Sequence, residues 1–140
     1  MKKFLNILLE IVLYIWQLPQ NIVGLFVLLF YKPTTKKIYN HIYNDIYYYQ
    51  TNSFPGGISL GKYIILGHDD RLSILHEHGH QIQSRYFGPL YLIAVGIASV
   101  FFNNLWDRIA HKKWTKEQRI KWYYNRYPEK WADKLGGAIR

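Results

Sequence analysis

A long apolar segment near the start of the chain, residues 4–31, constrains the fold more than any other feature of the sequence. It carries a single charged side chain, Glu10. As a helix it is long enough to span a bilayer, and Pro19 is expected to kink or divide it. Lysines flank the segment on both sides: Lys2, Lys3, Lys32, Lys36 and Lys37. The sequence therefore predicts one bent helix or two shorter ones.

The few polar residues of this segment fall within roughly a third of a helical wheel. They are Asn6, Glu10, Gln17, Gln20 and Asn21. Such a stripe fits a helix lying in the membrane interface, or a membrane helix that packs its polar side on the rest of the protein. A buried core helix of a soluble protein is the alternative. A cleaved signal peptide fits less well, because Glu10 interrupts the apolar region and no small-x-small cleavage site follows.

The composition favours a membrane surface as a partner of the chain. At 140 residues the chain fits a single domain. Its net charge of +9 suits an anionic membrane or nucleic acid. Its 13 Tyr and five Trp residues favour the membrane, since these side chains collect at membrane interfaces, and make nucleic acid the weaker choice. No cysteine is present, so any bound metal needs His and carboxylate ligands.

Residues 33–52 carry apolar side chains at a spacing that predicts an amphipathic helix. Ile38, Ile42, Ile46 and Tyr49 recur at intervals of three or four residues, and Thr34 or Thr35 is the expected N-cap. The tyrosines of this stretch are expected to serve packing or the membrane interface. They are Tyr39, Tyr43, Tyr47, Tyr48 and Tyr49.

The next segment, residues 58–66, is expected to be extended, as one strand or as a small hairpin with a turn or bulge at Gly61 and Lys62. A helix over residues 71–87 should follow. Asp69 or Asp70 can cap its N-terminus. Gly88 followed by Pro89 gives its stop.

This helix contains an H-E-x-x-H motif, formed by His76, Glu77 and His80. Residues four apart share one face of a helix, so the two imidazoles could hold one zinc ion between them. Glu77 lies about 100° further round the helix, where a carboxylate can act as a general base without ligating the metal. His78 lies about 200° from His76 and is expected to be a packing or surface residue.

The C-terminal half begins with a second apolar stretch, residues 90–106, which predicts a short, tilted membrane helix or a buried core helix. Basic residues outnumber acidic ones from Asp107 onward. Tryptophans are interleaved with them, which favours contact with anionic headgroups. They are Trp106, Trp114, Trp122 and Trp131.

A third metal ligand is expected from the end of the chain. Thr115 opens a helix with a capping box, and Pro128 ends that helix or begins another, which Gly136 and Gly137 close. On this last helix Glu129 and Asp133 share one face. Glu129 could complete a three-ligand zinc site, and Asp133 could accept a hydrogen bond from His76. An ordinary solvated helix, with the two carboxylates paired to neighbouring basic residues, is the alternative.

Together these motifs resemble the gluzincin metallopeptidases, in which H-E-x-x-H is followed downstream by a glutamate ligand. The arrangement of Glu129, Ala132 and Asp133 is similar to the E-x-x-A-D form found in membrane-embedded peptidases, which include the CAAX prenyl proteases and the bacterial heat-shock membrane protease. This chain is much shorter. The resemblance implies that His76, His80 and Glu129 bind one Zn²⁺, that Glu77 is the base and that Asp133 orients a ligand. It also implies that the segment before the helix is an edge strand that pairs with an extended peptide.

The fold expected from these features is a mostly helical α+β domain over residues 1–140, a minimal zincin-like fold. Residues 4–31 would associate with the membrane and residues 69–137 would form the metal-binding core. The expected function is hydrolysis of a peptide bond by a membrane-associated zinc enzyme acting on a peptide or protein. A non-catalytic membrane or partner-binding module with a structural zinc is the alternative.

Two further expectations concern the site and its sidedness. The candidate donors for a developing oxyanion are chiefly Tyr123, Tyr127 and His111, among which the sequence does not choose. The distribution of lysines leans toward a cytoplasmic catalytic side. The oligomeric state is not predicted.

Overall fold

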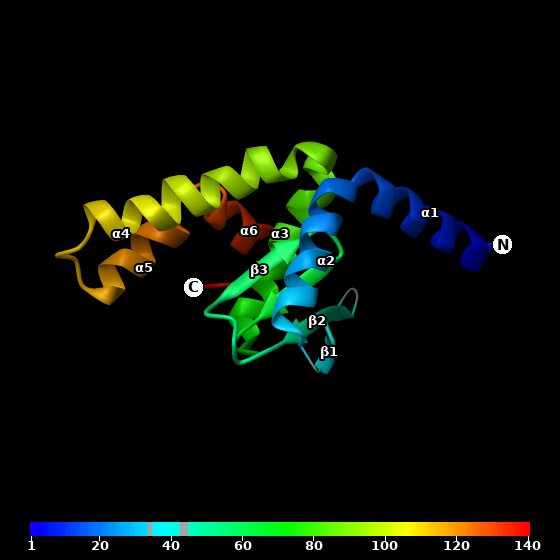
Figure 1. The fold of residues 1–140 in the computed structure, drawn as a ribbon, viewed down its shortest axis with the longest axis horizontal. Coiled ribbons are helices and arrows are strands. Elements are labelled where there is room, and N and C mark those ends of the chain that lie inside the picture. The colour runs from blue at the N-terminus through cyan, green and yellow to red at the C-terminus, as the bar shows by residue number, and fades with distance from the viewer. Residues whose placement is uncertain (34, 43–44) are drawn as a thin grey trace.

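The computed structural model describes residues 1–33, 35–42 and 45–140. Within them, six α-helices and a four-stranded mixed sheet form an α+β fold dominated by helix (Figure 1). The helices are α1 (Lys2–Trp16), α2 (Leu18–Tyr31), α3 (Arg71–Phe87), α4 (Trp106–Ala110), α5 (Lys116–Tyr124) and α6 (Glu129–Gly136), with a 3₁₀ turn η1 (Gly88–Leu90) and a π-type helix η2 (Leu92–Leu105). The strands are β1 (Thr35–Tyr39), β2 (Ile46–Gln50), β3 (Gly57–Leu60) and β4 (Tyr63–Leu66).

The apolar N-terminal segment is divided, as expected, beside Pro19. Helices α1 and α2 meet at Gln17 with a bend of 85°. The C-terminal half of the polar stripe faces the rest of the protein: Gln20 Nε2 donates to Ser84 Oγ at 2.9 Å, and Asn21 Oδ1 accepts from the backbone N–H of Lys62 at 2.7 Å. Helix α1 itself buries no residue and projects from the body of the molecule (Figure 1).

The helix predicted over residues 33–52 is wrong. The structure has an antiparallel pair of strands there, β1 and β2, with Ile38 opposite Tyr47 and Tyr39 opposite Ile46. β-branched and aromatic side chains fit a pleated, half-buried surface better than a helix, which explains the outcome. Strand alternation is visible in β2, where Ile46 and Tyr48 are buried and Tyr47 is exposed. The expected cap Thr34 and the tyrosine at position 43 lie outside the described residues.

The sheet has the order β1-β2-β4-β3, so β3 is an edge strand. β3 and β4 form the hairpin that the sequence allowed, with Gly61 in its turn at a positive φ of 62°. β2 and β4 are parallel. This arrangement places β3, the strand nearest the helix with the histidines, at a free edge of the sheet.

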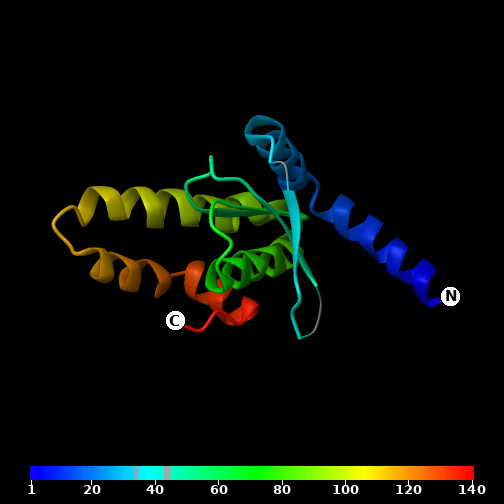
Figure 2. The same ribbon diagram turned by 90° about the horizontal axis from the view of Figure 1, so that it is seen from below.

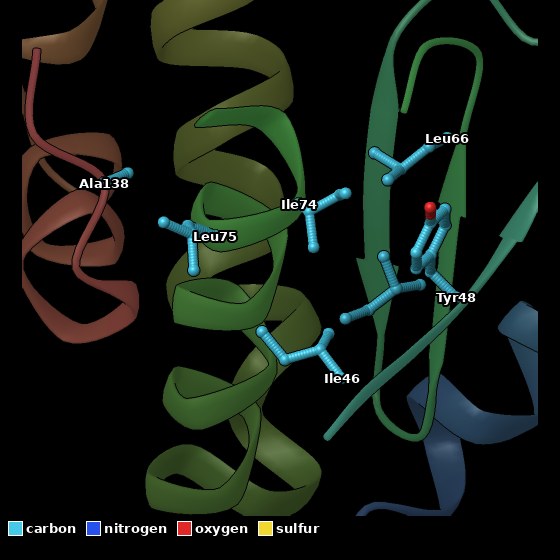
Figure 3. Close-up of a cluster of buried hydrophobic side chains, with 7 residues drawn as sticks. Ile46, Tyr48, Leu66, Ile74, Leu75 and Ala138 are labelled. Carbon is cyan, nitrogen blue, oxygen red and sulfur yellow. The ribbon is translucent and has the colours of Figure 1, made fainter. Parts of the chain in front are cut away.

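Helix α3 lies at the centre of the molecule and packs against the sheet on one side and α6 on the other (Figures 1 and 2). Asp70 caps it, accepting from the backbone N–H of Ser73 at 3.0 Å, and Gly88 ends it, both as predicted. Figure 3 shows the core cluster between these layers. It consists of Ile46, Tyr48, Ile64, Leu66, Ile74, Leu75 and Ala138. Each fully buried Leu or Ile stabilises such a core by about 1.5–3 kcal/mol.

Helices α3 and α6 approach each other unusually closely because glycine stands at both contact points. A Cβ atom added at Gly79 would collide with the backbone carbonyl of Ala132, and one added at Gly136 would collide with the carbonyl of Leu75. The capping box of Thr115 and Gln118 forms as predicted and begins α5, which runs back beside η2 and α4 (Figures 1 and 2). These features carry Glu129 to the face of α3 that bears the motif.

The second apolar helix extends beyond its predicted end. η2 and α4 together form one continuous helix from Leu92 to Ala110, which is 19 residues long. Only 17% of its most apolar 18-residue stretch is buried. Among the described residues it is the one single helix long and apolar enough to cross a membrane, and α1 with α2 meets the same criterion only as a bent pair. A buried core helix, one of the two predicted possibilities, does not fit so low a burial.

Candidate metal centre

Three side chains from two helices converge at the contact between α3 and α6. His76 Nε2 lies 3.1 Å from Glu129 Oε2, His80 Nε2 lies 3.0 Å from the same oxygen, and the two Nε2 atoms are 3.2 Å apart. All three residues are buried. The histidines come from successive turns of α3, and Glu129 is the first residue of α6. The three residues could hold a metal ion.

Each imidazole is oriented by a bond to its other ring nitrogen. His76 Nδ1 donates to Asp133 Oδ1 at 2.7 Å. His80 Nδ1 donates to Gln83 Oε1 at 2.8 Å, and Gln83 Nε2 donates in turn to the carbonyl of Pro128 at 2.9 Å. With Nδ1 protonated in both neutral rings, each Nε2 presents a lone pair to the centre of the cluster.

In that protonation state three lone-pair acceptors face one another, an arrangement that a cation between them stabilises. Ligands about 2.0–2.1 Å from a tetrahedral zinc ion stand roughly 3.3–3.4 Å apart, close to the separations found. The second oxygen of Glu129, Oε1, is buried and forms no close hydrogen bond among the described residues, although the Ser99 and Tyr123 hydroxyls act on this carboxylate. The donor set is oxygen and imidazole nitrogen, which suits Zn²⁺.

The pKa shifts in the cluster point to the same preference for positive charge. Burial acts to lower the pKa of His76, but hydrogen bonds to Asp133 and Glu129 outweigh it and raise that pKa to about 9. Burial acts to raise the pKa of Glu129, yet the bonds from His76 and His80 hold it well below the usual range. A proton or a metal ion can supply the charge, so metal binding competes with protonation.

Glu77 lies beside the cluster and does not belong to it. Its side chain is 94% removed from solvent, and desolvation by burial raises the pKa of its carboxyl group. Gly57, at the start of β3, makes room for it, because a Cβ atom at position 57 would collide with Glu77 Oε1. The first residue of the edge strand and the motif glutamate are thus in direct contact.

A cavity of about 290 Å³ opens above His76, Glu77, His80 and Glu129. β3 forms one wall of it, η2 forms another and Tyr123 of α5 closes a side. The η2 wall is apolar apart from Ser99. The lining residues of η2 are Leu92, Val95, Gly96, Ile97, Ser99, Val100 and Phe101. The cluster therefore faces a space in which a ligand could bind.

The predicted donors for an oxyanion separate in the structure. Tyr123 lines the cavity, with its hydroxyl 3.4 Å from Ser99 Oγ, and burial raises its pKa well above the usual range. Tyr127 instead donates to the carbonyl of Ala94 and is half exposed. His111 bonds Asp107 and stacks on Trp114. Neither Tyr127 nor His111 lines the cavity.

Sequence reasoning missed the residues that shape the centre without lying in the motifs. Gln83 holds His80, Gly57 leaves space for Glu77, and Gly79 and Gly136 permit the close helix contact. Gln83 follows His80 by three residues, the spacing of neighbours on one helix face, and this spacing is a signal that could have found it. In the sequence, a glycine within a helical pattern indicates only a lower helix propensity, and not a close contact with another helix.

Comparisons of the chain with family models, with curated proteins and with solved structures gave no match. The likeness to gluzincin peptidases therefore depends on the two motifs alone.

Proposed function

We propose that this protein is a membrane-associated, zinc-dependent metallopeptidase. The observation that carries the proposal is the convergence of His76, His80 and Glu129 in the lining of a cavity, with Glu77 beside them. Two histidines and a glutamate are the ligand set of several hydrolytic zinc sites. The resemblance of the two motifs to gluzincins points to the same chemistry.

The geometry favours a catalytic site over the alternative, a structural zinc in a non-catalytic module. Structural zinc sites are closed by four protein ligands, whereas catalytic sites have three and keep one position open. Here three ligands are available within the described residues, and the cavity lies on their open side. A buried carboxylate that is not a ligand, such as Glu77, is the general base that a hydrolase needs beside such a site.

In the proposed reaction, His76, His80 and Glu129 would hold a zinc ion, which when bound would supply Lewis-acid polarisation and lower the pKa of the attacking water. Glu77 takes a proton from the attacking water and delivers it to the leaving amine. The burial that raises its pKa suits both steps, because the group must accept and then release the proton. The hydroxyl of Tyr123, beside that of Ser99, is a donor in the cavity for negative charge on the substrate oxygen.

The edge strand β3 supplies the means to hold an extended peptide. The backbone N–H of Gly67 donates to the carbonyl of Gly56 at 2.7 Å. Because hydrogen bonding alternates along an antiparallel pair, the backbone groups of Gly57 and Ser59 point away from β4, toward the free edge. The carbonyl of Ser59 already accepts from the Tyr91 hydroxyl at 2.9 Å. Gly57 remains, next to Glu77, for strand addition by the substrate.

Membrane association is supported by apolar faces of α1, α2 and η2 that the described residues leave uncovered. Large apolar side chains of α1, α2 and η2 are exposed, a surface that monomeric soluble proteins rarely present. Examples are Phe4 (69% exposed), Phe26 (67%), Phe30 (79%), Ile93 (64%) and Phe102 (63%). Because η2 also forms a wall of the cavity, its exposed side would place the reaction at the membrane surface.

Metal analysis tests the ligand assignment. The dialysed protein should hold about one zinc per chain, and His76→Ala and Glu129→Ala should each lose it. His78→Ala and Glu117→Ala are matched controls, which lie outside the cluster and should keep the metal. Normal zinc content in both ligand variants would remove the basis of the proposal.

A further inference from the structure

A second cavity, of about 660 Å³, lies on the opposite side of α3 from His76, His80 and Glu129. It lies between α1, the turn of the β3–β4 hairpin, the first two strands and the outer face of α3. Its lining residues His78, Gln81, Ile82 and Arg85 lie on a different face of α3 from the motif ligands. The metal chemistry proposed above uses none of its lining residues.

Charges of both signs line this cavity without pairing. Three are basic (Lys36, Lys62 and Arg85) and two are acidic (Glu10 and Asp45). Among the described residues, none of these five side chains forms an ion pair with another. Lys36 instead lies over the ring of Tyr47, 5.0 Å from its centre. Charges of opposite sign that no ion pair joins complement a ligand that itself carries both.

An apolar groove along α1 runs into this cavity. Ile7, Ile11 and Ile15 line the groove, and Glu10 and Lys62 belong to both the groove and the cavity. Because no residue of α1 is itself buried among the described residues, its groove stays open to a lipid. A polar cavity of mixed charge that continues into an apolar groove matches the two ends of an amphiphile.

We propose that this cavity binds the headgroup of phosphatidylethanolamine, with an acyl chain along the α1 groove. Lys62 and Arg85 would contact the phosphate, and Glu10 and Asp45 would accept hydrogen bonds from the primary ammonium group. A purely anionic headgroup would leave the two carboxylates facing a like charge. The proposal rests on membrane association and not on the zinc chemistry.

Co-sedimentation with vesicles tests the site. Phosphatidylcholine vesicles are compared with vesicles in which about half of the lipid is phosphatidylethanolamine. Both lipids are electrically neutral, so the general attraction of a basic protein does not distinguish them. The wild-type chain should bind the mixed vesicles more tightly. Lys62→Gln with Arg85→Gln, and separately Glu10→Gln, should abolish this gain.

Lys112→Gln with Lys113→Gln is the matched control. It removes the same net charge outside the cavity and should keep the gain, and zinc content should be unchanged in every variant. Binding to phosphatidylcholine without a gain from phosphatidylethanolamine would overturn the headgroup site alone. The headgroup site would also be overturned if the control variant lost the gain from phosphatidylethanolamine as fully as Lys62→Gln with Arg85→Gln. Failure to bind either vesicle would contradict membrane association as well.

Discussion

Gly79 of α3 lies directly against the backbone carbonyl of Ala132 in α6, with no room for a methyl group between them. Four residues after Ala132 on α6, Gly136 meets the backbone carbonyl of Leu75 in the same way. The two glycines set the separation of the helices, and the helices carry the residues proposed as metal ligands. The close contact therefore links the packing of the core to the relative positions of His76, His80 and Glu129.

Gly79→Ala should destabilise the protein by about 1–3 kcal/mol, because overpacking forces the two helices apart. Helix propensity alone predicts the opposite sign, since alanine is favoured over glycine by roughly 0.5–1 kcal/mol. Chemical denaturation measures the difference. Gly96→Ala is the helical control, since a Cβ atom there meets only ordinary contacts. A Gly79→Ala protein as stable as this control would contradict the account.

Gln83→Leu should weaken zinc binding by about 10- to 100-fold, as removal of a group that orients a metal-ligating histidine usually does. The substitution removes the acceptor for His80 Nδ1 and the donor to Pro128. Competition with a chelator measures the affinity. Gln81→Leu serves for comparison, because Gln81 bonds the non-ligating His78. Similar affinities for the two variants would show that Gln83 does not orient the ligand.

Gly57→Ala should lower kcat by up to about 100-fold while the zinc content stays normal, because the new methyl group displaces the Glu77 carboxylate and not a ligand. Steady-state hydrolysis of a peptide substrate, with metal analysis of the same sample, separates the two effects. The neighbouring Gly56→Ala is a close control, since a Cβ atom there meets nothing within 4 Å. If both alanine variants turn over at the wild-type rate, Gly57 does not position the base.

Asp70→Ala should cost about 1 kcal/mol at pH 7 through loss of the cap of α3. Burial acts to raise the pKa of Asp70, but bonds from Ser73 hold it below its usual value of 3.8. The charged form thus stabilises the fold above about pH 4, and this contribution is lost as pH falls through the native pKa. Unfolding of wild type and Asp70→Ala at several pH values should show the difference shrinking in acid. Asp70→Asn, a cap that does not titrate, should keep its stability relative to Asp70→Ala.

The sequence was informative where local signals and tertiary structure agree. Helix α3 could be bounded because Asp70 and Gly88 act on neighbouring backbone groups. The third ligand could be proposed because Glu129 and Asp133 share a helix face. The division of the N-terminal segment followed from Pro19, and its polar stripe from the period of the helix.

The prediction of a helix over residues 33–52, where the structure has β1 and β2, was wrong for an identifiable reason. A spacing of four residues, as in Ile38, Ile42 and Ile46, fits a helical period, but it is also even and therefore fits one face of a strand. The enrichment in tyrosine and isoleucine was the better guide. The parallel pairing of β2 with β4 joins segments distant in sequence, and the close helix contact at Gly79 depends on α6. Neither the strand pairing nor the helix contact can therefore be predicted from a local sequence pattern.

The central claim is tested most directly by replacing Glu77 with glutamine, which keeps the size of the side chain and removes the base. Hydrolysis of a mixture of peptides is followed by mass spectrometry for the zinc-loaded wild type and for Glu77→Gln, with zinc content measured for both. The account predicts cleavage by the wild type, and a loss of about 10²- to 10⁴-fold in the variant with zinc retained. Cleavage at equal rates by the two proteins, or by neither, would contradict it.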